Sequence, residues 1–259
     1  MFPRPDGKQM RCGGPNFCHV CKADQAMVAP RQPSAKSKRI LVLAAHPDDE
    51  CLGCGGTIAR LAAEGHEVSI GILATGLTSR GTTTTAELET LMSQADNASK
   101  FLGASIVSFG NLPDQRLDTI GGLDISEVIK HLLDLYQPEV VYTHHIGDLN
   151  QDHRAMAHAT LIATRPVPGC SVKSVYAYEV ASSTEWAFST EPAFRPTTFV
   201  DISGDYLEKK IQAMEMYETE RRPFPHPRSP EALRAQAMLR GAQSGLMAAE
   251  AFQLVREIR

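Results

Sequence analysis

The sequence predicts an α/β fold in which helices cover both faces of a mostly parallel sheet. Apolar runs of strand length alternate with segments whose apolar residues recur at helical spacing, and this alternation is typical of parallel sheets. Several of the helical segments are closed by a glycine or a proline, as at Gly65, Pro138 and Pro166. Because 42% of the 259 residues are apolar, the chain can bury a sizeable core.

The predicted elements alternate from residue 39 onward. The first strand is expected at residues 39–45, where RILVLAA forms a continuous apolar run suited to a buried parallel strand. The first helix follows at residues 50–65. The other expected strands lie at residues 67–76, 105–110, 139–145, 172–180 and 197–202. The other expected helices lie at residues 86–104, 125–137, 152–165, 205–217 and 230–249.

Charge and composition exclude several classes of protein. The net charge of −4 does not suggest a nucleic-acid-binding surface, which usually requires a basic face. No apolar run is long enough to span a bilayer, and the N-terminus lacks the apolar core of a signal peptide. We therefore expect a soluble, cytoplasmic protein whose six cysteines are mostly reduced thiols.

The first 38 residues read as an N-terminal extension to a globular domain at residues 39–259. They are rich in Pro, Gly, Lys and Arg and show no steady periodicity. Cys12, Cys18 and Cys21, with His19, have the count and approximate spacing of a small structural zinc site. The alternative, a tail with incidental thiols, stays open.

Two polar clusters lie just past the ends of predicted strands. One covers residues 46–49, His-Pro-Asp-Asp, and the other runs from His144 to His153. Parallel α/β sheets bind ligands beyond the carboxyl ends of their strands, so both clusters are expected on one rim of the sheet.

The first cluster has the chemistry of a catalytic metal site. His46 and Asp49 are suitable zinc ligands, and His153 is the expected third, which leaves one position open. Asp48 then remains free to act as a general base. The following helix start is expected to keep both aspartates ionised. Glycines at positions 53, 55 and 56 are expected to let a substrate approach the backbone closely.

The motif AHPDDE at residues 45–50, followed by a glycine-rich turn and a later N-x-D-H at 150–153, resembles the PIG-L/LmbE family of metal-dependent N-deacetylases. The resemblance extends over residues 39–259 and includes SSTEW, FVDI and PHPRSPEALRAQAMLRG. It implies a Rossmann-like, three-layer α/β/α sandwich and action on N-acetylglucosamine-type conjugates. It also implies zinc on His46, Asp49 and His153, with Asp48 activating the zinc-bound water.

The second motif departs from the pattern of many members, which have His-Pro-Asp-His there. Asn150 occupies the position of the first histidine, and an asparagine can donate a hydrogen bond but cannot supply a proton. We therefore expect Asp48 to perform both proton transfers while Asn150 polarises the amide carbonyl. Asp152 is expected to orient a neighbouring residue. The alternative is that His144 or His145 reaches the substrate.

Other residues are expected to contact the substrate. Asp114 stands where the family has an aspartate that holds sugar hydroxyls, and Arg116 is close by in sequence. Arg80 is assigned to replace an arginine that is common in the family. These three residues and His144 form the predicted substrate-binding set.

The predicted function is removal of an N-acetyl group from a small amino-sugar conjugate. Two alternatives remain: deacylation of another amide, such as an N-acyl amino acid, peptide or antibiotic intermediate, and non-catalytic binding of a sugar or nucleotide. The family often forms oligomers, so a homo-oligomer is also an open expectation. The run TERRPFPHPRS at residues 219–229 reads as a clamp for an anionic part of the substrate, a subunit contact or a solvated surface.

Overall fold

The core of the fold is one mixed sheet. In the computed structural model, which describes residues 37–76, 84–188 and 192–259, seven strands pair in the order β3-β2-β1-β4-β5-β7-β6. The strands are β1 Arg39–Ala44, β2 Glu67–Ala74, β3 Ile106–Leu112, β4 Val140–His144, β5 Ser174–Tyr178, β6 Thr198–Asp201 and β7 Ala249–Glu257. The first five are parallel, whereas β7 runs antiparallel to both β5 and β6.

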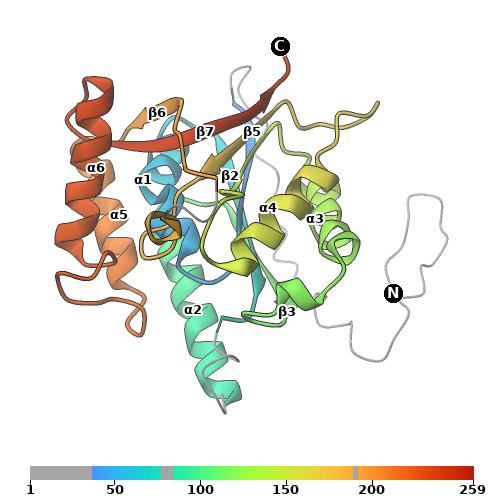
Figure 1. The fold of residues 1–259 in the computed structure, drawn as a ribbon, viewed down its shortest axis with the longest axis horizontal. Helices are drawn as coiled ribbons and strands as arrows, with labels where there is room; N and C mark the ends of the chain where they lie inside the picture. The colour runs from blue at the N-terminus through green and yellow to red at the C-terminus, as the bar shows by residue number, and fades with distance from the viewer. Residues whose placement is uncertain (1–36, 77–83, 189–191) are drawn as a thin grey trace. The chain divides into compact units, whose positions relative to one another are not determined.

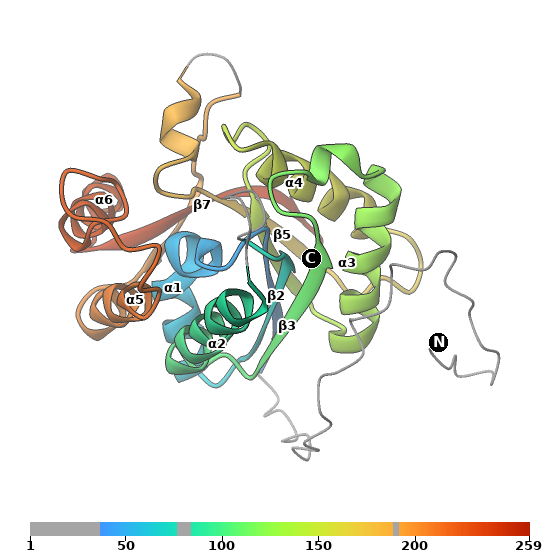
Figure 2. The ribbon, with the colours of Figure 1, turned by 90° about the horizontal axis from the view of Figure 1, so that it is seen from below.

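Helices cover both faces of this sheet, so the predicted α/β class is confirmed (Figure 1). The helices are α1 Asp49–Ala63, α2 Thr85–Phe101, α3 Gly122–Tyr136, α4 Gln151–Ala163, α5 Asp205–Glu215 and α6 Pro230–Ser244. Two short 3₁₀ helices of the described part are η2 Leu117–Thr119, between β3 and α3, and η3 Thr184–Ala187, between β5 and β6. Figure 2 shows α1, α2, α5 and α6 on one side of the sheet and α3 and α4 on the other.

The alternation of side chains along β1 explains the two layers. Ile40 and Val42 belong to the apolar core under α1, α2 and α5, while Leu41 and Leu43 belong to the core under α3 and α4. Successive strand residues point to opposite faces, so a strand buried on both sides reads as a continuous apolar run. All of the described residues belong to one compact unit, Gln32–Arg259.

One element differs from the sequence prediction. The last helix ends at Ser244 rather than near residue 249, because Gly245 adopts a left-handed conformation with φ 74° and closes it. Residues 249–257 then form β7, a strand that the sequence analysis did not predict. The apolar residues between Gly245 and Ala249 look like a continuation of the helical pattern, and only the glycine signals the change.

The glycines of α1 accommodate neighbouring side chains rather than a substrate, so the sequence interpretation of them is wrong. A Cβ at Gly53 would overlap the ring of Tyr178, and one at Gly56 would lie 2.8 Å from Cγ2 of Ile202. Gly55 faces the side chain of Lys210. These contacts let α1 lie close to β5 and α5.

The predicted N-terminal extension lies almost wholly outside the described residues, of which only residues 37 and 38 belong to it. Cys12, Cys18 and Cys21 are among the residues not described, and so is Arg80. Among the helices of the described part, none is both long and apolar enough to cross a membrane.

Candidate active site

The two polar clusters meet at the carboxyl edge of the sheet. β1 leads into His46 and α1, and the adjacent parallel strand β4 leads into the loop before α4. His46, Asp49 and His153 are all buried, and their ligand atoms lie within 4.8 Å of one another. Oδ2 of Asp49 lies 3.2 Å from Nδ1 of His46 and 3.2 Å from Nε2 of His153.

This group fits a divalent cation. Both ring nitrogens of His153 are buried without a hydrogen bond of good geometry, so a ligand position is available there. Burial lowers the pKa of His153, but Asp49 and Asp148 outweigh it and raise the pKa to about 9. Burial would raise the pKa of Asp49, but His153 holds it well below its usual range. A ligating imidazole must be neutral, so a bound cation would displace the proton and take over its interaction with Asp49. Two imidazoles with one carboxylate form a common catalytic zinc set.

Two buried carboxylates orient the histidines. Oδ1 of Asp148 lies 3.1 Å from Nδ1 of His153, and Ser183 and Thr184 donate hydrogen bonds to the same carboxylate. Oδ2 of Asp152 lies 3.0 Å from Nε2 of His46. Its other oxygen accepts a 2.9 Å hydrogen bond from the amide of Leu117. Carboxylates that hold the second nitrogen of a ligating histidine fix its tautomer and ring orientation.

A second group of possible ligands, His46, Asp114 and Asp152, shares one histidine with the first. Oδ1 of Asp114 lies 3.4 Å from Nε2 of His46, on the side of Asp152. Nδ1 of His46 faces Asp49, and Nε2 faces Asp152. His46 can therefore bind a metal ion through Nδ1 together with Asp49 and His153, while Asp152 holds the ring at Nε2.

Asp48 remains outside the group of ligands. Its carboxylate accepts a 2.6 Å hydrogen bond from Nη1 of Arg228, which also donates to Glu220 at 3.0 Å. Burial raises the pKa of Asp48 to about 7, although Arg228 lowers it. The expectation that both aspartates stay ionised near neutral pH agrees with the lowered pKa of Asp49, whereas burial opposes it at Asp48. A pKa near neutrality suits a group that accepts and returns a proton.

The backbone of Asp48 has φ 103° and ψ −26°, a conformation that residues other than glycine rarely adopt. Its amide donates a 3.2 Å hydrogen bond to Oε2 of Glu50, and the hydroxyl of Tyr217 donates to the other oxygen of Glu50. Glu50 is fully buried. The last residue of the HPDDE run thus holds the backbone of Asp48 in place.

A cavity of about 220 Å³ opens onto these residues. Besides the residues already described, its walls include Pro47, Gly76, Gln115, Asn150 and Ser182. Oδ1 of Asn150 caps α4 by accepting a 2.9 Å hydrogen bond from the amide of Asp152. The side-chain amide nitrogen of Asn150 is then the group that can donate into the cavity.

Of the predicted substrate-binding residues that the structure describes, one lines the cavity and two do not. Asp114 lines the cavity. His144 does not: it is buried, its Nε2 accepts a 2.8 Å hydrogen bond from the amide of Ala45, and its ring stacks on His153 with centroids 4.0 Å apart. Arg116 is exposed and is not among the residues that line the cavity. His144 and Arg116 therefore have no direct contact with the cavity, and Arg80 lies outside the described residues.

Several residues of the site escaped the sequence analysis. Asp148 lies in the quoted stretch HHIGDLNQDH, and its place two residues before the cap of α4 was the available signal. Glu50 is the last residue of the first motif, AHPDDE, and the sequence analysis gave it no role. Gln115, whose Nε2 lies 3.3 Å from Nε2 of His46, carries no sequence signal beyond its place next to Asp114.

Comparison with known proteins identifies the family. The family model PIG-L, described as GlcNAc-PI de-N-acetylase, matches residues 41–164, which contain both motifs. A relative from Escherichia coli (strain K12), the uncharacterized deacetylase YaiS, is 30% identical over 192 residues, covering 71% of this chain and 92% of the relative. The chain belongs to the PIG-L family. Membership makes it a hydrolytic N-deacetylase, in agreement with the buried His/Asp group.

Solved structures share the fold of this PIG-L chain. The N,N'-diacetylchitobiose deacetylase from Pyrococcus horikoshii is 21% identical, covers 86% of each chain and has a TM-score of 0.68. GalB, the 4-carboxy-2-hydroxymuconate hydratase from Pseudomonas putida KT2440, is 24% identical and covers 86% of this chain and 98% of its own, with a TM-score of 0.63. Because one of these enzymes is a hydratase, the fold alone does not determine the reaction, and residues of the site must do so.

Proposed function

We propose that this PIG-L member is a zinc-dependent deacetylase that hydrolyses the acetamide of an N-acetylglucosamine-type conjugate. The observation that carries the proposal is a buried group of possible ligands, His46, Asp49 and His153. The carboxylate of Asp48, which is not part of this group, lines the same cavity. The names of the family model and of the chitobiose deacetylase support an amino-sugar substrate.

His46, Asp49 and His153 would hold the metal ion, with Asp152 and Asp148 keeping the two imidazoles in orientation. When bound, zinc acts as a Lewis acid toward the acyl carbonyl and lowers the pKa of a water molecule in the cavity. The set of two histidines and one aspartate suits zinc but does not exclude iron or another divalent ion.

Asp48 serves as general base and then as general acid. Its carboxylate takes a proton from the attacking water as the oxygen bonds to the acetamide carbon, and it gives that proton to the nitrogen as the C–N bond breaks. The products are acetate and a free amine. Arg228 keeps the carboxylate of Asp48 in position through its 2.6 Å hydrogen bond.

Two further residues would act on the substrate. The amide nitrogen of Asn150 donates a hydrogen bond to the oxyanion that develops on the carbonyl oxygen, which a neutral side chain can do without a proton transfer. Asp114, on the wall of the cavity, accepts hydrogen bonds from sugar hydroxyls.

The test is release of acetate and of a free amine from methyl N-acetylglucosaminide, compared with an N-acetyl amino acid and an N-acetyl dipeptide. We expect turnover of the sugar, loss of turnover on chelation, and recovery on addition of zinc. Preferential turnover of the amino acid or peptide would replace the amino sugar with another N-acyl amide. Absence of turnover of all three by zinc-loaded protein would contradict the proposal.

A further inference from the structure

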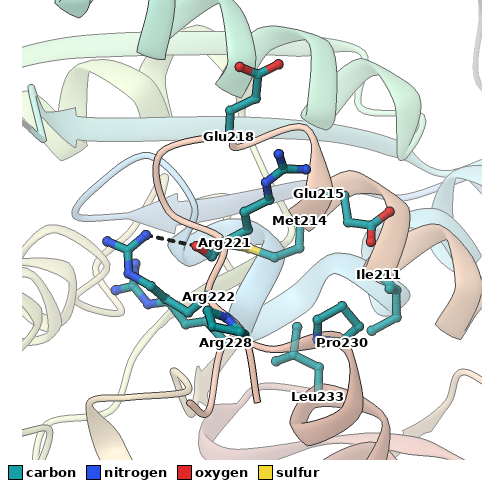
Figure 3. Close-up of a pocket in the computed structure, with 10 residues that line it drawn as sticks. Ile211, Met214, Glu215, Glu218, Arg221, Arg222, Arg228, Pro230 and Leu233 are labelled. Atoms are coloured by element: carbon teal, nitrogen blue, oxygen red, sulfur yellow. Dashed lines mark hydrogen bonds between the residues drawn. The ribbon is translucent and has the colours of Figure 1, made fainter. Parts of the chain in front are cut away.

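A groove next to the catalytic cavity has no role in the mechanism above. It lies between α5 and the start of α6, along the chain segment at 216–229 that joins them, and has a volume of about 300 Å³ (Figure 3). Arg228 lines both the groove and the catalytic cavity, so the two spaces adjoin at this residue. The Arg228 side chain, which pairs with Asp48 and Glu220, therefore stands where the cavity and the groove meet.

The floor of the groove is apolar. Ile211 and Met214 come from α5, and Pro230 and Leu233 come from the first turn of α6. Ile211, Met214 and Leu233 are buried, so they are packed in fixed positions. An apolar floor of this kind favours a hydrocarbon part of a ligand over a second hydrated sugar.

The rim of the groove carries guanidinium groups. Figure 3 shows Arg222 and Arg228 toward one end, Glu215 toward the other, and Arg221 between them. Arg222 donates to the carbonyl oxygens of Thr219 and Arg221 at 2.5 and 2.9 Å, which holds its side chain against the segment.

Arg221 and Arg222 form no ion pair with the part of the protein that the structure describes. Among the described residues, no carboxylate lies within 4.0 Å of the guanidinium of Arg221 or Arg222. Glu215 and Glu218 also line the groove, so an anionic ligand is favoured near Arg222 and disfavoured near the glutamates. The planar fork of a guanidinium matches a carboxylate or phosphate in two-point hydrogen bonding.

We propose that this groove is a second substrate subsite, which binds an aglycone with an apolar stem and a terminal carboxylate or phosphate. The stem lies on the floor of Ile211, Met214 and Leu233, and the anion is held by Arg221 and Arg222. The inference rests on the proposed function, since it places the acetamido sugar of the same molecule beside Asp48.

The experiment compares three glycosides of N-acetylglucosamine with the zinc-loaded protein. Their aglycones are 6-carboxyhexyl, its methyl ester, and 6-phosphohexyl, so the first two differ in the negative charge and in one methyl group. We expect kcat/KM for the carboxylate to exceed that for the ester about tenfold, through KM rather than kcat, which corresponds to about 1.4 kcal/mol. The phosphate arm shows which anion fits better.

The double variant Arg221→Gln/Arg222→Gln should abolish this preference. Both positions are exposed, so the variant is expected to fold, and its unfolding midpoint checks this. The matched control is Arg165→Gln, which removes an exposed positive charge beyond the C-terminal end of α4, opposite the end that carries His153. Arg165→Gln should keep the preference.

The outcomes separate the two proposals. Equal kcat/KM for the carboxylate and the ester in the wild type overturns the subsite and leaves the deacetylase intact. If no glycoside is hydrolysed, the deacetylase proposal fails, and binding is then measured by calorimetry with the Asp48→Asn variant. The subsite is supported if Asp48→Asn binds the carboxylate more tightly than the ester and if adding Arg221→Gln and Arg222→Gln removes this difference. Equal binding overturns it.

Discussion

Asp48, the proposed general base, combines a buried carboxylate with a strained backbone. A non-glycine residue at φ 103° persists only where its surroundings hold it, and Glu50 supplies that support through the amide of Asp48 and the hydroxyl of Tyr217. Arg228 holds the carboxylate itself. Asp48 is therefore held through both its backbone and its side chain.

The support from Glu50 can be tested by Glu50→Ala. This change leaves two buried donors without an acceptor, so we expect the free energy of unfolding to fall by about 3 kcal/mol and kcat to fall at least about tenfold. Tyr217→Phe removes one donor and should lower stability by only about 1 kcal/mol. Urea unfolding and turnover of metal-loaded protein provide both readouts. A stability loss with unchanged kcat would show that Glu50 has no influence on Asp48.

The contact between Asp48 and Arg228 predicts how kcat/KM depends on pH. Arg228 favours the charged form of Asp48 and lowers its pKa, so Arg228→Gln should raise that pKa. Because the base must be ionised, the acid limb of the kcat/KM profile should move to higher pH. Arg234→Gln, which breaks an exposed pair with Glu208, is the control and should leave the limb in place. An unmoved limb in Arg228→Gln would contradict the role of Asp48.

At the scale of elements, α1 shows how packing determines the placement of the site. Gly53 leaves room for the ring of Tyr178, whose hydroxyl donates a 2.7 Å hydrogen bond to the carbonyl of Leu43 on β1. The start of α1, which carries Asp49, is thereby held next to the ends of β1 and β5. A glycine that appears to serve a ligand thus serves the contact between a helix and the sheet.

The packing of α1 predicts the effect of Gly53→Ala. Alanine favours a helix by about 1 kcal/mol, yet here its methyl group overlaps a buried ring, so we expect a net loss of about 2 kcal/mol or more. Gly122→Ala in α3 is the matched control, because no atom lies within 4 Å of the added Cβ. It should be neutral or slightly stabilising. Thermal unfolding compares the two, and equal midpoints would contradict the close contact with Tyr178.

The sequence predicts the alternating part of the fold well, because a strand buried on both faces and an amphipathic helix have distinct apolar patterns. β1 and α1 begin within a residue or so of their predicted starts. β7 escapes because it pairs antiparallel at the far side of β5, and its first residues continue the apolar pattern of α6. Local pattern alone does not contain such a long-range pairing.

At the scale of the whole molecule, the sequence likewise predicts some residues of the candidate site and misses others. His46, Asp49 and His153 are brought together because β1 and β4 are parallel neighbours, which the alternating pattern already favours. Arg228 reaches Asp48 through a hydrogen bond from a segment 180 residues further along the chain, and no spacing rule contains that contact. Asp148 lies 3.1 Å from His153, and its only sequence signal is its place before the cap of α4. The buried position of His144 is likewise a result of packing against His153.

Metal binding should stabilise the whole chain. A ligand that binds only the folded state at a hundred times its dissociation constant adds about 2.7 kcal/mol. Zinc added to chelator-treated protein is therefore expected to raise the unfolding midpoint, whereas His153→Ala should not respond. Arg116→Gln, at an exposed position away from the cavity, should respond like the wild type. A response of His153→Ala equal to that of the wild type would place the ion elsewhere.

The most direct measurement of the central claim is metal content and turnover of the Asp48→Asn variant, determined on the same sample. We expect one ion per chain, as in the wild type, with kcat lowered at least about a thousandfold, because the ligands remain and the proton acceptor is lost. Near-normal turnover with the metal retained would contradict the separation of Asp49 as ligand from Asp48 as base.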